Sequence, residues 1–322
     1  MCTAVNCQRY FGRTLDFHRT PGECIAITPR AFPLHCRHND TLMHHLALIG
    51  IAHICDGTPL YYDAMNECGL CGAALYFPEN ASYSAPADGS YNIASFEVLP
   101  FVLSQCSDVA AAREVLKTIR ITGDVFAKEL PPYPLHWIFS DHTASIVLEA
   151  CMSGVQVYEN PFGVLTNNPP FSYHRSRMSD FVSLTPGQPE NRLAPNIDLH
   201  LYSRGIGSMG LPGDHSSSSR FIRGFFNKRY ALDVSTSADV NAFFTVMGTV
   251  SIPRGCVKDN ENTPFYTIYT SCADREEKIY YYTTHKNRQI CGVRLSEESL
   301  TGNKLITVSM QDRDSICFSD PI

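Results

Sequence analysis

The sequence has no long hydrophobic run and no excess of positive charge. No stretch approaches the roughly 18 consecutive apolar residues of a membrane-spanning helix, and the longest candidate, LALIGIAHIC at 46–55, is interrupted by His53. The formal net charge is −6, so the chain is not expected to attract nucleic acid or an anionic membrane. No basic stretch followed by an apolar core opens the sequence. We therefore expect a cytoplasmic protein whose partners are small molecules or further copies of itself.

The sequence also lacks a nucleotide-binding loop and the ligand spacing of a zinc site. GIGSMGLPG at 205–213 carries several glycines, but Pro212 and the absence of a preceding strand predict an ordinary loop. Cys68 and Cys71 form CGLC, with no second CxxC at zinc-site spacing. We interpret them as small buried cysteines at a hairpin. The alternative, a redox pair or half of a zinc site, would make the chain a cysteine-rich thiol- or metal-binding protein.

The remaining cysteines do not suggest a disulfide framework. The chain has 13 cysteines, an odd number, and no secretion signal precedes them, so reduced thiols are expected. The histidines are not organised into a ligand set either. Neither a metal nor another cofactor is therefore expected.

What is present is enough apolar sequence for one large core. Of the 322 residues, 44% are hydrophobic, and we expect a single domain over residues 1–322. Alternating apolar residues predict strands in 2–17, 24–28, 46–55, 59–65, 70–77, 135–141, 144–150, 155–160, 163–168, 265–274 and 278–295. Helices are predicted over 92–119, with a cap at Ser107, and over 171–184, 216–232 and 237–250. Strand blocks around helix blocks favour an α+β fold with antiparallel sheets covered by helices.

The chain begins MCTAVNCQRYFGRTLDF, with a cysteine directly after the initiator methionine. Removal of Met1, which a small second residue favours, would place a free amine and a thiol on the same residue. The thiol reacts as thiolate, and an α-amine with a pKa of about 7.7–8 is suited to accept its proton. Arg13 would favour the thiolate and Asp16 would orient the ammonium. On one regular strand these two would face opposite ways, so at least one is expected to act from a strand end or a bulge.

Seven strings in the sequence resemble the choloylglycine hydrolase family, which comprises bile salt hydrolases and penicillin V acylases. They are MCTAV, YFGRTLD, YDAMNECGL, ALYFP, PLHW, VLTNNPPF and GLPGDHSSSSRFIR, and they extend from residue 2 to about residue 225. The family belongs to the N-terminal nucleophile hydrolases. The resemblance therefore implies an αββα sandwich of two antiparallel sheets between helical layers. It also implies an amide hydrolase without a cofactor, assembled as a homo-oligomer, specifically a tetramer.

The resemblance assigns roles to individual residues. Cys2 matches the nucleophile, Arg13 the arginine beside it, Asp16 the carboxylate that binds the amine, Asn167 the oxyanion donor, with the adjacent Asn168 as the alternative, and Arg220 the second arginine. Tyr76 stands where bile salt hydrolases usually carry asparagine and penicillin V acylases carry tyrosine, and its backbone N–H would join the oxyanion hole. An amide NH₂ is a suitable oxyanion donor on chemical grounds as well.

The resemblance places the acyl pocket in the loops after Asp16, at 57–65 and at 125–136. These offer an apolar set consisting of Leu15, Tyr61, Tyr62, Phe126 and Leu130, for which ordinary core packing is the alternative. Arg19 and Lys128 lie where an anionic glycine or taurine end would be placed. Because a steroid buries more apolar area than a phenoxymethyl ring, at ~25 cal/mol per Å², a conjugated bile salt is the first expectation. A penicillin V acylase or acyl-homoserine lactone acylase is the alternative, and a binding protein that retains Met1 is a further one.

Overall fold

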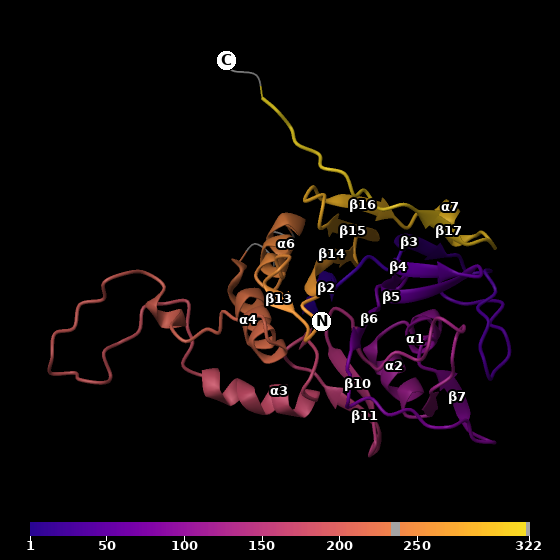
Figure 1. Ribbon diagram of the computed structural model, residues 1–322, viewed down its shortest axis with the longest axis horizontal. Helices are drawn as coiled ribbons and strands as arrows, with labels where there is room; N and C mark the ends of the chain where they lie inside the picture. The colour runs from indigo at the N-terminus through magenta and orange to yellow at the C-terminus, as the bar shows by residue number, and fades with distance from the viewer. Residues whose placement is uncertain (233–238, 320–322) are drawn as a thin grey trace.

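The computed structural model describes residues 1–232 and 239–319. Two β-sheets form the centre of the molecule, and helices cover their outer sides (Figure 1). One continuous core joins residues of both sheets, including Val5 of the first sheet and Met65 and Ile138 of the second. A second core lies beneath the helices that cover the second sheet. This is the αββα arrangement that the family resemblance implied.

The first sheet has seven strands and carries the amino terminus. Its strand order is β12-β1-β2-β14-β15-β16, with β13 paired to β14, and all pairs are antiparallel. The strands are β1 (Cys2–Cys7), β2 (Tyr10–Phe17), β12 (Val164–Leu165), β13 (Val257–Lys258), β14 (Pro264–Asp274), β15 (Ile279–Thr284) and β16 (Cys291–Arg294). Gly12 allows β14 to approach β2 closely, since an added Cβ would lie 1.9 Å from the carbonyl oxygen of Ser271.

The second sheet has eight antiparallel strands in the order β11-β10-β9-β6-β5-β4-β3-β17. The strands are β3 (Glu23–Thr28), β4 (Leu48–Cys55), β5 (Thr58–Asn66), β6 (Cys71–Tyr76), β9 (Leu135–Ser140), β10 (Ser145–Cys151), β11 (Gly154–Glu159) and β17 (Ile306–Val308). Each segment predicted to be extended holds at least one strand of the two sheets, and β13 and β17 lie outside the predicted segments. In the segment 163–168 the strand is short, because only Val164 and Leu165 pair with β1.

Helices lie on the outside of both sheets. They are α1 (Val98–Gln105), α2 (Val109–Leu116), α3 (Phe171–Arg177), α4 (Ser217–Tyr230), α6 (Val240–Gly248) and α7 (Glu297–Leu300). α1 and α2 pack on the second sheet, whereas α4 and α6 pack on the first. The serine-rich start of α4 is explained by Ser216, whose hydroxyl accepts a hydrogen bond from the Ser219 N–H. No helix in the described ranges is long and apolar enough to cross a membrane.

The predicted helix over 92–119 is wrong at both ends. β7 (Tyr91–Ala94) and β8 (Ile119–Thr122) form a separate parallel pair there, with Ile93 and Ile121 buried. The predicted cap at Ser107 is also wrong by one residue, because the Asp108 carboxylate accepts the Ala111 N–H at 2.8 Å.

Two other helix predictions differ from the structure at their ends. Over 171–184 the α-helix stops at Arg177, and a short 3₁₀ turn, Met178–Phe181, follows it. In the prediction 237–250, residues 237 and 238 lie outside the described residues, and α6 occupies the remainder up to Gly248.

The CGLC motif lies at the turn between β5 and β6, as the hairpin interpretation predicted. Cys71 is buried in β6, but Cys68 is exposed, so the expectation of burial holds for only one of the two. All 13 cysteines are free thiols. Within the part of the chain that the structure describes, no group of three or more histidine, cysteine, aspartate or glutamate side chains is arranged to hold a metal ion.

Candidate active site

Cys2 is the first residue of β1, and the N-terminus of the chain lies near the middle of the molecule (Figure 1). Cys2 pairs with Leu15 of β2, and its side chain is buried in the core between the sheets. Met1 continues the pairing, because its amine donates to the main-chain oxygen of Asp16 at 2.6 Å and its carbonyl accepts the Asp16 N–H at 2.9 Å. Burial lowers the pKa of the Met1 amine.

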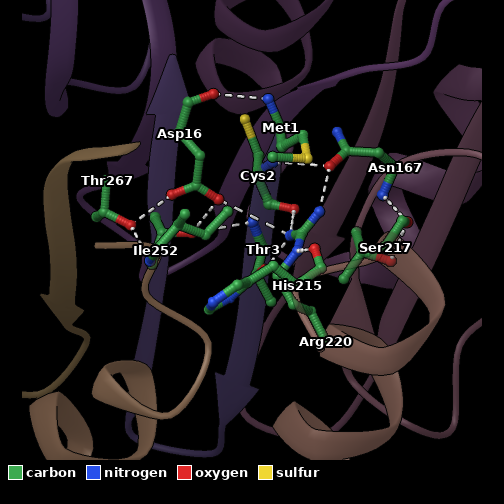
Figure 2. A network of polar contacts seen from close by, with 12 residues as sticks. Met1, Cys2, Thr3, Asp16, Asn167, His215, Ser217, Arg220, Ile252 and Thr267 are labelled. Carbon is green, nitrogen blue, oxygen red and sulfur yellow. Dashed lines mark hydrogen bonds and ion pairs between the residues drawn. The ribbon is translucent and has the colours of Figure 1, made fainter. Parts of the chain in front are cut away.

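Polar groups from distant parts of the chain surround Cys2 (Figure 2). The Cys2 N–H donates to Oδ1 of Asn167 at 2.7 Å. Arg220, at the start of α4, donates to the same Oδ1 at 2.9 Å and also to the carbonyl oxygen of Cys2. While Met1 is attached, the Cys2 nitrogen is a peptide nitrogen. After its removal the same atom would be an α-amine already in contact with Asn167.

Asn167 has one amide hydrogen committed and one available. Its Nδ2 donates to the main-chain oxygen of Tyr76 at 2.7 Å, and an amide NH₂ carries two donors. Its own N–H donates to the Ser217 hydroxyl at 2.8 Å. Asn168 donates from its Nδ2 in the same way, to the Pro78 carbonyl at 2.7 Å, but the Cys2 N–H contacts the side chain of Asn167. The geometry therefore favours Asn167 over Asn168 as the group facing Cys2.

Arg13, on β2 of the first sheet, contacts two strands of the second sheet. Its guanidinium is fully buried and donates to the carbonyl oxygens of Ala74 at 2.9 Å and Tyr62 at 3.2 Å. Burial acts to lower its pKa, but the negative charge available at Cys2 and at Asp63 outweighs this and raises it. Nη2 of Arg13 is buried without a hydrogen-bond partner, so its two N–H donors remain for a substrate or for the thiolate.

Asp63 is a buried counter-charge for Arg13 that sequence reasoning missed. Its carboxylate accepts hydrogen bonds from Tyr269 at 2.6 Å, from Ser271 at 2.6 Å and from Tyr280. Burial raises the pKa of Asp63, and the charge of Arg13 and the three hydroxyls oppose that shift. The only signal in the sequence was a carboxylate in the apolar strand TPLYYDAMN, and its partners come from β14 and β15.

Asp16 faces the side of β2 opposite to Arg13. Its carboxylate accepts hydrogen bonds from Thr267 at 2.7 Å and Thr14 at 3.2 Å, and it lies 3.8 Å from Arg220. β2 itself is continuous. The irregularity lies in β14, between Thr267 and Tyr269, opposite the end of β2. The Met1 amine contacts the main chain of Asp16 and not its carboxylate, because the additional residue moves the amine away from the position of Cys2.

The structure brings only part of the predicted acyl pocket to Cys2. Leu15 pairs directly with Cys2, and Tyr62 packs against the same core. Tyr61 lies on the other side of β5, buried in the second core, where its hydroxyl contacts Thr28. Tyr61 therefore packs in the core beneath the helices, which is the alternative to a role in the acyl pocket.

The loop residues of the predicted pocket lie further out. Phe126 lines a cavity of about 600 Å³ whose lining contains none of the candidate catalytic residues, and its ring contacts Phe96 at 5.1 Å. Leu130 is half-buried, and its N–H closes a turn onto the Ala127 carbonyl. The expected rim residues Arg19 and Lys128 are both exposed.

Two antiparallel sheets between helical layers, with a cysteine at the start of a central strand, define the N-terminal nucleophile hydrolase fold. Residues 2–308 match the sequence profile of the linear amide C-N hydrolases, choloylglycine hydrolase family. The chain belongs to this family, and it is therefore a hydrolase of linear amide C–N bonds. The resemblance inferred from the seven strings is confirmed.

Individual relatives cover nearly the whole chain. It is 41% identical to a bile salt hydrolase/transferase of Lactiplantibacillus plantarum over 97% of each chain. A conjugated bile acid hydrolase of Lactobacillus gasseri is 33% identical over 92% of this chain and 95% of its own length. Among solved structures, the C2A mutant of the Clostridium perfringens conjugated bile acid hydrolase has a TM-score of 0.92, 34% identity and coverage of 99% and 100%. Penicillin V acylase of Agrobacterium tumefaciens, at 19% identity, coverage of 96% and 91% and TM-score 0.75, shares the fold.

Proposed function

We propose that this protein hydrolyses the amide bond of conjugated bile salts, with Cys2 as the nucleophile. The observation that carries the proposal is the position of the Cys2 nitrogen, 2.7 Å from Oδ1 of Asn167, at the buried start of β1. Removal of Met1 would turn that nitrogen into a base on the same residue as the thiol. The names of the relatives support a bile acid amide as the substrate.

The reaction follows from these groups. The α-amine of Cys2 takes the thiol proton, and the thiolate attacks the amide carbonyl carbon. The negative charge that develops on the carbonyl oxygen is stabilised by the second side-chain N–H of Asn167 and by the backbone N–H of Tyr76. The ammonium then protonates the leaving amine as the C–N bond breaks. A water molecule, deprotonated by the same amine, releases the bile acid and restores the thiol.

Measured kcat/KM for glycocholate and for penicillin V tests the substrate assignment. We expect glycocholate to be preferred, because a steroid buries more apolar surface against the core side of Leu15 and Tyr62 than a phenoxymethyl ring does. Tyr76→Asn is expected to raise bile salt turnover further, because bile salt hydrolases usually carry asparagine at this position. The side chain of Tyr76 is 41% exposed at the end of β6, so the change should not disturb the core. Tyr91→Asn, at a similarly exposed tyrosine on β7, is the matched control and should change neither value. A clear preference for penicillin V would reject bile salts as the substrate class.

Homo-oligomerisation into a tetramer is part of the proposal. The segment between α3 and α4 extends away from the body of the molecule (Figure 1) and exposes large apolar side chains. Val182 is 85% exposed, Leu193 93% and Tyr202 81%. Apolar groups at such exposure are typical of surfaces that another chain covers. Light scattering should therefore report about four times the 35.9 kDa of one chain, and Leu193→Glu with Tyr202→Glu should lower this mass. A monomeric mass for the unmodified protein would contradict the assembly.

A cytoplasmic location also belongs to the proposal. It is supported by the 13 free cysteines, because a reducing compartment keeps such thiols unpaired.

A further inference from the structure

Two buried histidines hold the main-chain carbonyls on either side of the backbone nitrogen of Asn167. Nε2 of His136, on β9, donates to the carbonyl oxygen of Thr166 at 2.9 Å. Nε2 of His174, on α3, donates to the carbonyl oxygen of Asn167 itself at 2.9 Å. A carbonyl oxygen only accepts hydrogen bonds, so each ring must carry a proton at Nε2. Successive carbonyls of the segment that presents Asn167 are therefore held from two different elements.

Glu149 and Phe77 orient the ring of His136. Oε1 of Glu149 lies 3.2 Å from Nδ1 of His136, and both side chains are almost fully buried. The same Oε1 accepts the N–H of Phe171 at 2.9 Å, which ties the pair to the start of α3. Phe77 stacks on the imidazole at 4.2 Å and 5°. It directly follows Tyr76, whose carbonyl accepts Nδ2 of Asn167. His136 thus contacts the chain neighbours of Asn167 and Tyr76, the two residues of the candidate oxyanion site.

His174 is fixed in its neutral form. Burial lowers its pKa to about 4, so at neutral pH the ring carries a single proton, which the contact with the Asn167 carbonyl places on Nε2. Its ring stacks on Phe221 at 4.9 Å and 11°, and Phe221 directly follows Arg220 on α4. His174 therefore holds Asn167 from the side of Arg220.

A buried polar pair is not explained by stability alone. Well-packed apolar side chains of similar volume often stabilise a core as well as a buried ion pair does, whereas a hydrogen bond to one specific carbonyl constrains the backbone at that point. Oε2 of Glu149 has no hydrogen-bond partner, so the pair is not optimised for stability. The contacts that it does make are to Thr166 and Phe171, the two ends of the segment that carries Asn167.

We propose that His136, oriented by Glu149, is a positioning residue that fixes the Thr166 carbonyl and thereby aims the Asn167 amide at the carbonyl oxygen of the substrate. This inference rests on the oxyanion role proposed for Asn167. His136 does not touch the reacting atoms. Its contribution is orientation, and an error of about 1 Å in such a group can lower turnover by about 10²-fold.

Two neutral replacements of His136 separate the two contacts of the ring. In His136→Gln the side-chain nitrogen reaches the position of Nε2 and keeps a donor for Thr166. In His136→Asn it corresponds to Nδ1 and keeps only the contact with Glu149. We expect kcat to fall by about 10- to 100-fold in His136→Asn with little change in KM, and to be largely recovered in His136→Gln. Equal losses that follow the melting temperatures of the two variants would overturn the proposal.

A double-mutant cycle with Asn167→Ala connects the effect to its target. In the Asn167→Ala background, His136→Asn should cause little further loss of kcat, because the amide that it positions is absent. If His136→Asn lowers kcat by the same factor with and without Asn167→Ala, the positioning role would be overturned. Retention of activity by Asn167→Ala alone would instead reject the oxyanion role proposed for Asn167, so the two failures are distinguishable.

The chain offers a matched control. His45 also contacts two main-chain carbonyls, those of Leu46 at 2.7 Å and Phe32 at 2.8 Å, but none of these residues belongs to the candidate site. His45→Asn should leave kcat unchanged whatever its effect on stability. If His136→Asn does not fold, Glu149→Ala is measured in its place, because it removes Oε1, the atom that faces Nδ1 of His136. The same fall in kcat at constant KM is expected, and unchanged kcat would overturn the proposal.

Discussion

Cys2→Ala is expected to abolish turnover, by roughly four orders of magnitude or more, because it removes the atom that attacks the amide carbon. The fold should remain, since the change deletes one buried sulfur at the start of β1 and costs on the order of 1 kcal/mol. A relative that shares 34% identity has been crystallised with the corresponding C2A change. Steady-state turnover of glycocholate, together with a thermal melt, measures both expectations.

Cys2→Ser and Cys71→Ala provide the comparison for this variant. The serine variant should keep only a trace of activity, because a hydroxyl is far less ionised than a thiol at neutral pH. Cys71 is also buried and free, but it lies in the second sheet and should be replaceable by alanine without loss of kcat. Full activity in Cys2→Ala would reject Cys2 as the nucleophile and direct attention to the CGLC cysteines.

Blocking the amino terminus is expected to have an equally large effect. In the chain that carries Met1, the Cys2 nitrogen is a peptide N–H that donates to Asn167, and a peptide nitrogen is not a useful base. Intact mass should show that active protein has lost Met1. A variant with additional residues before Cys2 should be inactive until a protease cleaves them and leaves Cys2 first.

The same additional residues placed after Ile322 serve as the control and should leave activity unchanged. Full activity in protein of unprocessed mass would contradict the mechanism. It would point instead to the Met1 amine as the base, a group that burial already makes less basic and that contacts the Asp16 main chain.

The sequence by itself determined the fold class and the centre of the chemistry. Apolar residues between turn signals located the strands of both sheets except the short edge strands β13 and β17. The position of Cys2 next to Met1 is a property of the chain order and needs no structure. The family strings pointed to Asn167 and Arg220, which the structure places against the main chain of Cys2 and against each other.

Only the tertiary structure decided how those residues are held. Asp63 of β5 is bonded by hydroxyls of β14 and β15. His136 of β9, in the second sheet, reaches Thr166, which follows β12 of the first sheet. Tyr61 and Tyr62 are adjacent and chemically identical, yet one faces the helices and the other the space between the sheets. Local periodicity reports which residues are buried. It does not report which partner a buried polar group finds, because that choice depends on contacts between segments far apart in the chain.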